Sequence, residues 1–151
     1  MGAALLVWCV DSAIMSRELA AQAPRFDAQI RWTSYGIPHV KADDWGSLGY
    51  GFAYATARDA VCTMARDVVM VNGGLSRHFG STNGNHESDV FHRAVLDSAA
   101  VRAFTRGQSD KSNQFADGYV AGYNRYLRDH AAELPTGCRG AAWGRPVSAD
   151  D

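Results

Sequence analysis

The sequence predicts an α+β fold that is mostly helical, with a pair of short strands near the N-terminus followed by helices. Two observations indicate this order. Apolar and polar residues alternate over residues 28–34, and apolar residues recur at helical spacing in two later stretches. The 151 residues amount to about one domain. A composition of 46% apolar and 21% charged residues is typical of globular proteins and excludes collagen-like and disordered chains.

Charge and cysteine content exclude several function classes. Fifteen basic and sixteen acidic residues leave a net charge of −1, and no block of Lys or Arg stands out. We therefore expect no nucleic-acid partner. No apolar run approaches the roughly 18 residues that span a membrane, so no membrane partner is expected. Three cysteines without a CxxC pair give no indication of zinc, and we expect no metal or cofactor in this chain.

Residues 1–23 differ in composition from the rest and are interpreted as a leader or possible signal peptide. Gly2–Val10 is a short apolar run, and Ala21-Gln22-Ala23 matches the small-x-small cleavage pattern. Against this, no Lys or Arg precedes the apolar run, and Asp11 interrupts it. A displaced start codon or a frayed N-terminal helix are the alternatives. Ordered structure is expected from near Phe26.

The first expected elements are two strands. Ile30 and Trp32 alternate with polar neighbours over residues 28–34, which is the period of a half-buried strand. Residues 35–38 (Tyr-Gly-Ile-Pro) have the composition of a turn, in which Gly36 is free to adopt a positive φ. A second short strand is expected over residues 39–42. Such a hairpin is marginal alone and needs a partner sheet.

A long helical stretch is expected from residue 44 to Asn72. Asp43 or Asp44 is its expected N-cap, and Asn72-Gly73-Gly74 is a C-cap signal. Arg58-Asp59 is a possible bend, with Asp59 as a new N-cap. Two apolar faces follow from the spacing. The first comprises Leu48, Phe52 and Ala55, and the second comprises Val61, Met64, Ala65, Val68 and Val71.

The second half of the chain is expected to be helical as well. After a polar loop at residues 81–85, residues 86–104 indicate one or two short helices, and residues 107–112 a linker. A further amphipathic helix follows, with Ser109 as its expected cap, and residues 135–137 (Pro-Thr-Gly) stop it. Its apolar stripe comprises Phe115, Tyr119, Gly122, Tyr123, Tyr126 and Leu127.

The glycine-rich segment Gly46–Gly51 has two interpretations. It looks like a phosphate-binding loop, but it lacks a preceding strand, the Lys-Ser/Thr pair of a P-loop and a third glycine at dinucleotide spacing. Close helix packing, at positions that admit no side chain, is the favoured interpretation.

No catalytic set stands out among the remaining residues. Ser34, His39 and Asp43 offer the residue types of a hydrolytic triad, but a tight turn between Ser34 and His39 disfavours their convergence. The five histidines show no paired-ligand spacing and are interpreted as structural or surface residues. These histidines are His39, His78, His86, His92 and His130.

The order of several short motifs resembles the penicillin acylase family. Residues 30–40 (IRWTSYGIPHV) and 49–55 (GYGFAYA), with Arg58-Asp59, resemble the start of its members. The continuation resembles the branch that contains aculeacin A acylase and the acyl-homoserine-lactone acylases. The pieces that carry this second resemblance are residues 72–73, 77–80, 88–93, 118–127 and 138–146. In all, the resemblance runs from about Ile30 to Ser148.

This resemblance implies an N-terminal-nucleophile hydrolase with an αββα fold. In that family an exported precursor cuts itself into α and β subunits, and the new N-terminus of β is the nucleophile. The implied reaction is hydrolysis of an N-acyl amide bond in an acyl-homoserine lactone, a lipopeptide or a penicillin, in the periplasm or outside the cell. Residues 24–151 resemble only an N-terminal fragment of the α subunit, an incomplete domain. No catalytic residue is therefore assigned, and the fragment alone is expected to be inactive.

The resemblance also implies a disulfide between Cys62 and Cys138, because acylases of this branch carry a pair at similar positions. Cys9 lies in the expected leader and would be lost on cleavage. A buried free Cys62 with an unrelated exposed Cys138 is the alternative. For function, the alternative is a stand-alone helical binding or interaction module that never had a β subunit.

Overall fold

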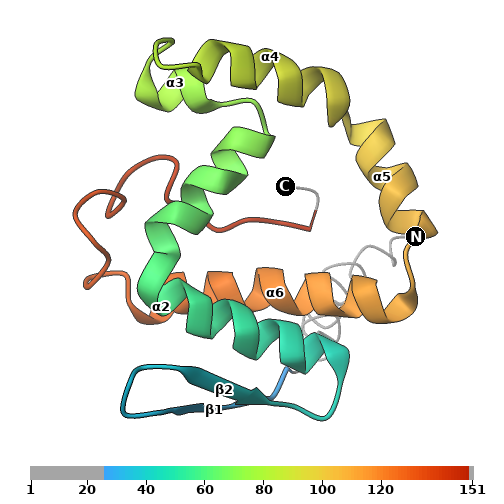
Figure 1. The fold of residues 1–151 in the computed structure, drawn as a ribbon, viewed down its shortest axis with the longest axis vertical. Helices are drawn as coiled ribbons and strands as arrows, with labels where there is room; N and C mark the ends of the chain where they lie inside the picture. The colour runs from blue at the N-terminus through green and yellow to red at the C-terminus, as the bar shows by residue number, and fades with distance from the viewer. Residues whose placement is uncertain (1–25, 150–151) are drawn as a thin grey trace, which may run out of the picture.

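Two strands followed by five helices make up residues 26–149, which are those described by the computed structural model (Figure 1). The mostly helical α+β arrangement predicted from the sequence is confirmed. The expected leader, with Cys9, lies outside the described residues. The elements are β1 (Gln29–Trp32), β2 (Pro38–Lys41), α2 (Trp45–Val71), α3 (Leu75–Phe79), α4 (Asn85–Val95), α5 (Ser98–Gly107) and α6 (Asp110–Asp129). No helix among these is long and apolar enough to cross a membrane.

The two strands form the predicted antiparallel hairpin, with Ile30 opposite Val40. Each strand has four residues, and β1 is shorter than the expected 28–34. It ends early because Thr33 is used by the turn: its carbonyl accepts from Gly36 N–H at 3.0 Å and its Oγ1 accepts from Ile37 N–H at 3.1 Å. Gly36 has the expected positive φ, +78°.

Asp44, rather than Asp43, caps the start of α2. Its Oδ1 accepts from Ser47 N–H at 2.7 Å, and the Ser47 hydroxyl donates to Oδ2 at 2.8 Å. The same hydroxyl, which is buried, accepts from Asp27 N–H at 3.1 Å. One serine therefore joins the helix start to the chain that leads into β1.

α2 changes direction once, at Ala60, where φ is −136° and ψ is 22°. The predicted bend at Arg58-Asp59 lies one residue earlier than the kink. The residue with non-helical φ and ψ is Ala60, so the junction expected at Asp59 is displaced by one residue. The kink turns the second half of α2 away from α6 and toward α3 and α4 (Figure 1).

α2 and α6 run in the same direction and pack closely through glycines. The Gly46 carbonyl lies where a Cβ on Gly118 would be, and the Phe115 carbonyl lies where a Cβ on Gly49 would be. The interpretation of the glycine-rich segment as a helix-packing surface is confirmed.

The expected apolar face with Phe52 is confirmed in part. Ala55 is buried, and the Phe52 ring lies 6.1 Å from that of Phe115 and 6.3 Å from that of Tyr119 on α6. Phe52 itself remains 49% exposed.

The helices after α2 follow the predicted pattern with two differences. Residues 86–104 hold two helices, and Asp97 caps the second by accepting from Ala99 and Ala100 N–H at 2.8 Å. The short α3 was not predicted. The expected linker 107–112 is reduced to two residues, because Ser109 already caps α6 through Ser112 N–H.

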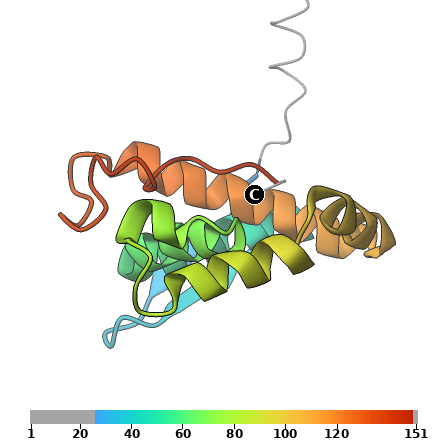
Figure 2. The same cartoon turned by 90° about the horizontal axis from the view of Figure 1, so that it is seen from above.

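The end of α6 differs from the prediction. The helix stops at Asp129, before the Pro-Thr-Gly segment, and residues 130–133 continue as a turn in which the Glu133 N–H donates to the His130 carbonyl at 2.8 Å. The chain then returns along α6 (Figure 2). Asn124 holds this segment, since its amide donates to the Val147 carbonyl at 2.7 Å and accepts from the Val147 N–H at 2.9 Å.

The hydrophobic core lies where α2, α6 and the returning segment meet. Tyr123 and Cys138 are its largest fully buried side chains. Tyr123 comes from the predicted stripe of α6, whose interpretation as core is confirmed for this residue and Leu127. The remaining core members are Ala53, Ala57, Val61, Met64, Ala65 and Leu134.

Candidate functional site

The structure does not assemble a triad from Ser34, His39 and Asp43. Ser34 lies in the hairpin turn, His39 lies on β2 opposite Arg31, and Asp43 precedes α2. All three are exposed, and no hydrogen bond of the described residues joins any two of them. A nucleophile and its base must lie within hydrogen-bonding reach, so these residues do not form a hydrolytic site.

Cys62 and Cys138 are joined by a disulfide in the structure, with their Cα atoms 5.4 Å apart. That separation lies within the range of about 4.4–6.8 Å found in native disulfides. The bond links α2, just past its kink, to the segment after α6. Cys138 is 1% exposed and belongs to the core, in contrast to the exposed loop cysteine of the alternative interpretation.

A cluster of titratable side chains joins the end of α6 to α2. The Tyr54 hydroxyl lies 3.2 Å from His130 Nε2 and donates to Asp129 Oδ2 at 3.3 Å. His130 Nδ1 lies 3.1 Å from Glu133 Oε2, and its ring stacks on Tyr126 at 4.4 Å. The side chains thus form a continuous hydrogen-bonded chain.

The electrostatics of this cluster indicate a structural role. Burial, and then the nearby Asp129 charge, raise the pKa of Tyr54. Its hydroxyl therefore stays protonated and serves as a donor, not as a nucleophile. The hydrogen bond from Arg125, whose Nε lies 2.7 Å from Oδ2, is the main cause that lowers the pKa of Asp129. This carboxylate is held ionised as an acceptor.

Asp89 of α4 accepts two backbone hydrogen bonds from the start of α3. Its Oδ1 accepts from Leu75 N–H at 2.7 Å and its Oδ2 accepts from Ser76 N–H at 2.8 Å. A side chain 13 to 14 residues later thus caps α3, which has no cap of its own. Burial alone would raise the pKa of Asp89, but the bonds from Ser76 and Leu75 lower it. Asp89 is structural.

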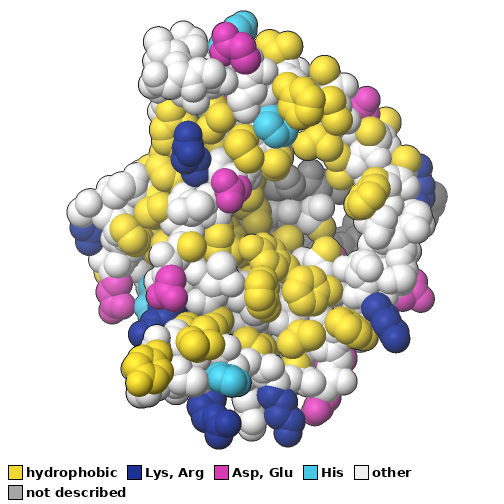
Figure 3. Space-filling model, viewed as in Figure 1, with side chains coloured by type: hydrophobic (Ala, Val, Ile, Leu, Met, Phe, Trp, Pro, Cys, Tyr) yellow, Lys and Arg dark blue, Asp and Glu magenta, His cyan; other side chains and the backbone are white. Residues whose placement is uncertain are grey.

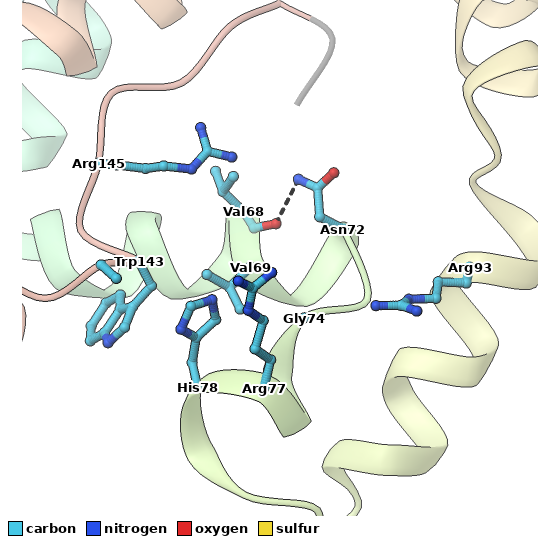
Figure 4. A pocket seen from close by; sticks show the side chains of 10 residues that line it. Val68, Val69, Asn72, Gly74, Arg77, His78, Arg93, Trp143 and Arg145 are labelled. Carbon is cyan, nitrogen blue, oxygen red and sulfur yellow. Dashed lines mark hydrogen bonds between the residues drawn. The ribbon is translucent and has the colours of Figure 1, made fainter.

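An open recess of about 320 Å³ lies between α2, α3, α4 and residues 142–145 (Figure 4). Figure 4 shows the Arg77 guanidinium and the His78 imidazole side by side, with Arg93 beyond Gly74 on one side and Arg145 on the other. None of the ten lining residues is acidic. The recess has the chemistry of an anion-binding surface.

Large apolar side chains remain exposed on several helices. On the face drawn in Figure 3, hydrophobic side chains gather over α2 and α6 and along α4 and α5. Large contiguous apolar surface of this kind is typical of partner-contacting faces in general. The members with the largest exposed fractions on the helices are Phe104, Phe91, Val90, Val95, Phe52 and Trp45, and Leu96 directly follows α4.

No group of three or more His, Cys, Asp or Glu side chains in residues 26–149 is placed to hold a metal ion. His78 lines the recess beside Arg77, and His130 belongs to the hydrogen-bonded chain with Tyr54. His92 Nδ1 lies 2.8 Å from the Ser88 carbonyl.

Comparison with known proteins decides the family. The penicillin amidase family model matches residues 27–145. The chain belongs to this family. It is 41% identical over 138 residues to acyl-homoserine lactone acylase PvdQ of Pseudomonas fluorescens and 41% identical over 138 residues to aculeacin-A acylase of Actinoplanes utahensis. The aligned regions cover 87% and 83% of this chain, but only 18% and 17% of those proteins.

A solved structure supports the same fold. The thermostable penicillin G acylase from Alcaligenes faecalis matches with a TM-score of 0.71 at 24% identity, covering 84% of this chain and 68% of that chain. The fold class expected from the resemblance is confirmed. The penicillin amidase family members named here are acylases, so the chain is a member of an amide-hydrolase family.

The sequence analysis missed the basic recess. Arg77 and Arg93 were noted only as parts of the resemblance, and His78 was interpreted only as a structural or surface histidine. They lie 15 to 16 positions apart in the sequence, on α3 and α4. The signal that could have found them is the polar loop at residues 81–84, where the chain turns back and places α3 and α4 beside each other.

Proposed function

We propose that this chain is the N-terminal part of the α subunit of an N-terminal-nucleophile amide hydrolase. Its substrate class is an N-acylated amine, such as an acyl-homoserine lactone, a lipopeptide or a penicillin with its acyl side chain. The observation that carries the proposal is the 41% identity to both an acyl-homoserine lactone acylase and aculeacin-A acylase, over more than four fifths of the chain.

The proposed reaction proceeds through an acyl-enzyme on the β subunit. The hydroxyl of the β N-terminal residue attacks the amide carbon while its own α-amine accepts the proton. The C–N bond breaks, the proton passes to the leaving amine, and an ester to the enzyme remains. Water then attacks the ester, releasing the acid and restoring the hydroxyl. Every catalytic group in this scheme belongs to β.

The role of the present chain is to support and cover that subunit. A two-stranded hairpin is marginally stable by itself. We therefore propose that strands β1 and β2 of this chain join a sheet that the β subunit supplies. The exposed side chains of α4 and α5, including Phe91 and Phe104, supply apolar area for the same partner. We propose a heterodimer made from one precursor.

Export to the periplasm or the outside of the cell is part of the proposal. The expected leader at residues 1–23 would direct export, and a Cys62–Cys138 disulfide requires an oxidising compartment. Both features support the same location.

The test begins with the DNA downstream of the codon for Asp151. A frame that encodes further helices, a spacer and a cleavage junction would be expressed together with this chain. We expect two subunits, and release of homoserine lactone or of a free acid from an acylated substrate. The matched control replaces the new N-terminal nucleophile with alanine and should abolish both. A stop codon without such a frame nearby, and no hydrolysis, would favour the stand-alone binding module.

A further inference from the structure

The hairpin of β1 and β2 has a ladder whose hydrogen-bond pattern is fixed by one proline. Trp32 lies opposite Pro38, and a proline has no N–H to donate, so this pair is a non-hydrogen-bonded pair of the antiparallel ladder. The bond from the Thr33 N–H to the Ile37 carbonyl, at 3.0 Å, agrees with this pattern. Because hydrogen-bonded and non-hydrogen-bonded pairs alternate, the next non-hydrogen-bonded pair lies two residues further along each strand.

The two outer edges of the hairpin therefore differ in their backbone groups. Ile30 and Val40 form the next non-hydrogen-bonded pair, and the N–H and C=O groups of such pairs point away from the partner strand. The outer edge of β1 thus presents both groups of Ile30 and of Trp32. The outer edge of β2 lacks one donor, at Pro38. Proline in sheets is found on edge strands with its nitrogen toward solvent, so β2 is suited to be the last strand of a sheet and β1 an inner one.

The outer edge of β1 is open in the part of the chain that the structure describes. No hydrogen bond within residues 26–149 uses the outward N–H and C=O groups of Ile30 and Trp32. Pairing along β1 is regular from Gln29 to Trp32, without a bulge or a proline. An unpaired edge of this kind is a template for a further strand.

One face of the hairpin packs on α2 (Figure 1). A Cβ atom on Gly51 of α2 would lie 2.7 Å from Val40 Cγ1 and 3.9 Å from Ile30 Cγ1, so both side chains point toward this helix. Trp32 shares the face of Ile30 because it lies two residues along the strand, and the Arg58 guanidinium of α2 lies 4.1 Å from its ring centre. A strand added beside β1 must therefore present apolar side chains on this face.

An open recess of about 490 Å³ adjoins the same face at β1. The hairpin contributes Ile30 and Trp32 to the lining of this recess, and β2 contributes no residue. Tyr54 of α2 and Tyr126 of α6 also line it. The recess therefore offers space for apolar side chains beside the open edge and not beside the edge with the proline.

The opposite face of the hairpin is basic. Residues 29–41 contain Arg31, His39 and Lys41 and no Asp or Glu. All three side chains are exposed, and none has an ion-pair partner within residues 26–149. Arg31 lies directly opposite His39, so β2 offers it no carboxylate. A carboxylate on a strand beside β1 would make a favourable cross-strand pair with Arg31.

We propose that the outer edge of β1 pairs with an extended strand of the β subunit, in which apolar side chains facing α2 alternate with a carboxylate beside Arg31. This pairing rests on the proposed function, which supplies the partner subunit. β1 itself contains no carboxylate, so a second copy of this chain, paired strand to strand, would leave Arg31 without one.

The first experiment measures backbone hydrogen exchange in the assembled wild-type protein, resolved to single residues by mass spectrometry. The amides of Ile30 and Val40 form a matched pair, because both point away from the ladder of the hairpin. Amides that are bonded in a ladder exchange slowly. We expect the Ile30 amide to exchange at least about tenfold more slowly than the Val40 amide. Exchange at Val40 as slow as at Ile30, or slower, overturns the proposal.

Charge reversal tests the side-chain part of the proposal. Arg31→Glu is compared with Lys41→Glu, which makes the same charge change on the same face but on β2. We expect Arg31→Glu to lower the yield of assembled heterodimer about fivefold and Lys41→Glu to leave it within about twofold of the wild type. Equal losses with the two variants contradict a carboxylate beside Arg31.

Assays of hydrolysis and of subunit composition on the same wild-type preparation separate this proposal from the function on which it rests. A heterodimer that hydrolyses its substrate but protects Val40 rather than Ile30 overturns the strand pairing and leaves the proposed function intact. A chain that purifies without a second subunit and without hydrolysis overturns both. A dimer of two copies of this chain, paired through β1, overturns the choice of partner.

Discussion

The carbonyl oxygen of Gly46 occupies the position that a Cβ atom on Gly118 would need. Four residues further along both helices, the carbonyl of Tyr50 stands in the same relation to Gly122. The axes of α2 and α6 are therefore in contact at the level of the backbone, over at least one turn. Any side chain on these α6 glycines must push the helices apart.

Gly118→Ala tests this contact. The new methyl group would meet backbone atoms that cannot rotate away, so we expect the free energy of unfolding to fall by about 3 kcal/mol, the upper end for overpacking. Gly107→Ala, at the end of α5 with open space around it, is the matched control and should be neutral or slightly stabilising. The measurement is the urea midpoint of the assembled protein. Equal midpoints for the two variants would contradict the close approach.

Asp89→Asn tests the cap that α4 provides to α3. Because the folded-state pKa of Asp89 lies below its ordinary value, ionised Asp89 stabilises the fold above about pH 4, and this contribution is lost as the pH falls through the folded-state pKa. Asparagine resembles the protonated acid. We therefore expect a lower urea midpoint than the wild type at pH 7, and a difference that shrinks as the pH falls progressively below about 4.

Asp117→Asn is the matched control for that experiment. Asp117 lies exposed on α6, and its carboxylate does not cap a helix as that of Asp89 does. Its replacement should change the midpoint little at either pH. A pH-independent difference between wild type and Asp89→Asn would show that the carboxylate charge is not what caps α3.

The sequence allowed the prediction of elements that depend on local signals. The alternation around Ile30, the Asp44 cap and the Ser109 cap are each decided within a few residues, and the structure has all three. Helical spacing indicated which residues share a face with Phe52, but not that 49% of this side chain stays exposed beside α6. The close approach of the two helices was predicted from the glycines of Gly46–Gly51 and not from the hydrophobic pattern.

The parts of the candidate site that could not be predicted depend on distant contacts. Asp89 caps a helix that starts 14 residues earlier, and Tyr54 bonds to side chains 75 and 76 residues later. No spacing rule connects such positions in a single sequence. The recess could not be predicted for the same reason. Arg145 lines the same recess as Arg77 only because the chain returns along α6.

The isolated chain is expected to be poorly soluble or molten. Exposed apolar side chains on α4 and α5, such as Phe91 and Phe104, would be left without the partner that we propose to cover them. Thermal unfolding and NMR dispersion of the purified 151-residue chain measure this. A sharp cooperative melt with a well-dispersed spectrum would contradict this prediction.

The isolated chain should also hydrolyse neither penicillin G nor long-chain acyl-homoserine lactones. Ser34 and His39 are exposed and unconnected, so nothing activates a nucleophile there. Product release is measured with the isolated chain and with the assembled protein. Ser34→Ala and His39→Ala in the assembled protein should leave the rate within about twofold. Turnover by the isolated chain that either variant abolishes would restore the local triad.

Cys62→Ala together with Cys138→Ala tests the disulfide in the exported protein. The bond closes a loop with a sequence separation of 76, and the loop-entropy model gives about 4 kcal/mol for that length as an upper figure. Because Cys138 is also a core residue, its replacement removes packing as well. Reduction of the wild type separates the two effects: it removes the bond and keeps both side chains. We expect reduction to lower the urea midpoint of the wild type and to leave that of the double variant unchanged. Alkylation followed by mass spectrometry should find neither thiol free before reduction and both free after it. Two thiols that alkylate in the unreduced exported protein would show that the pair is not bonded there.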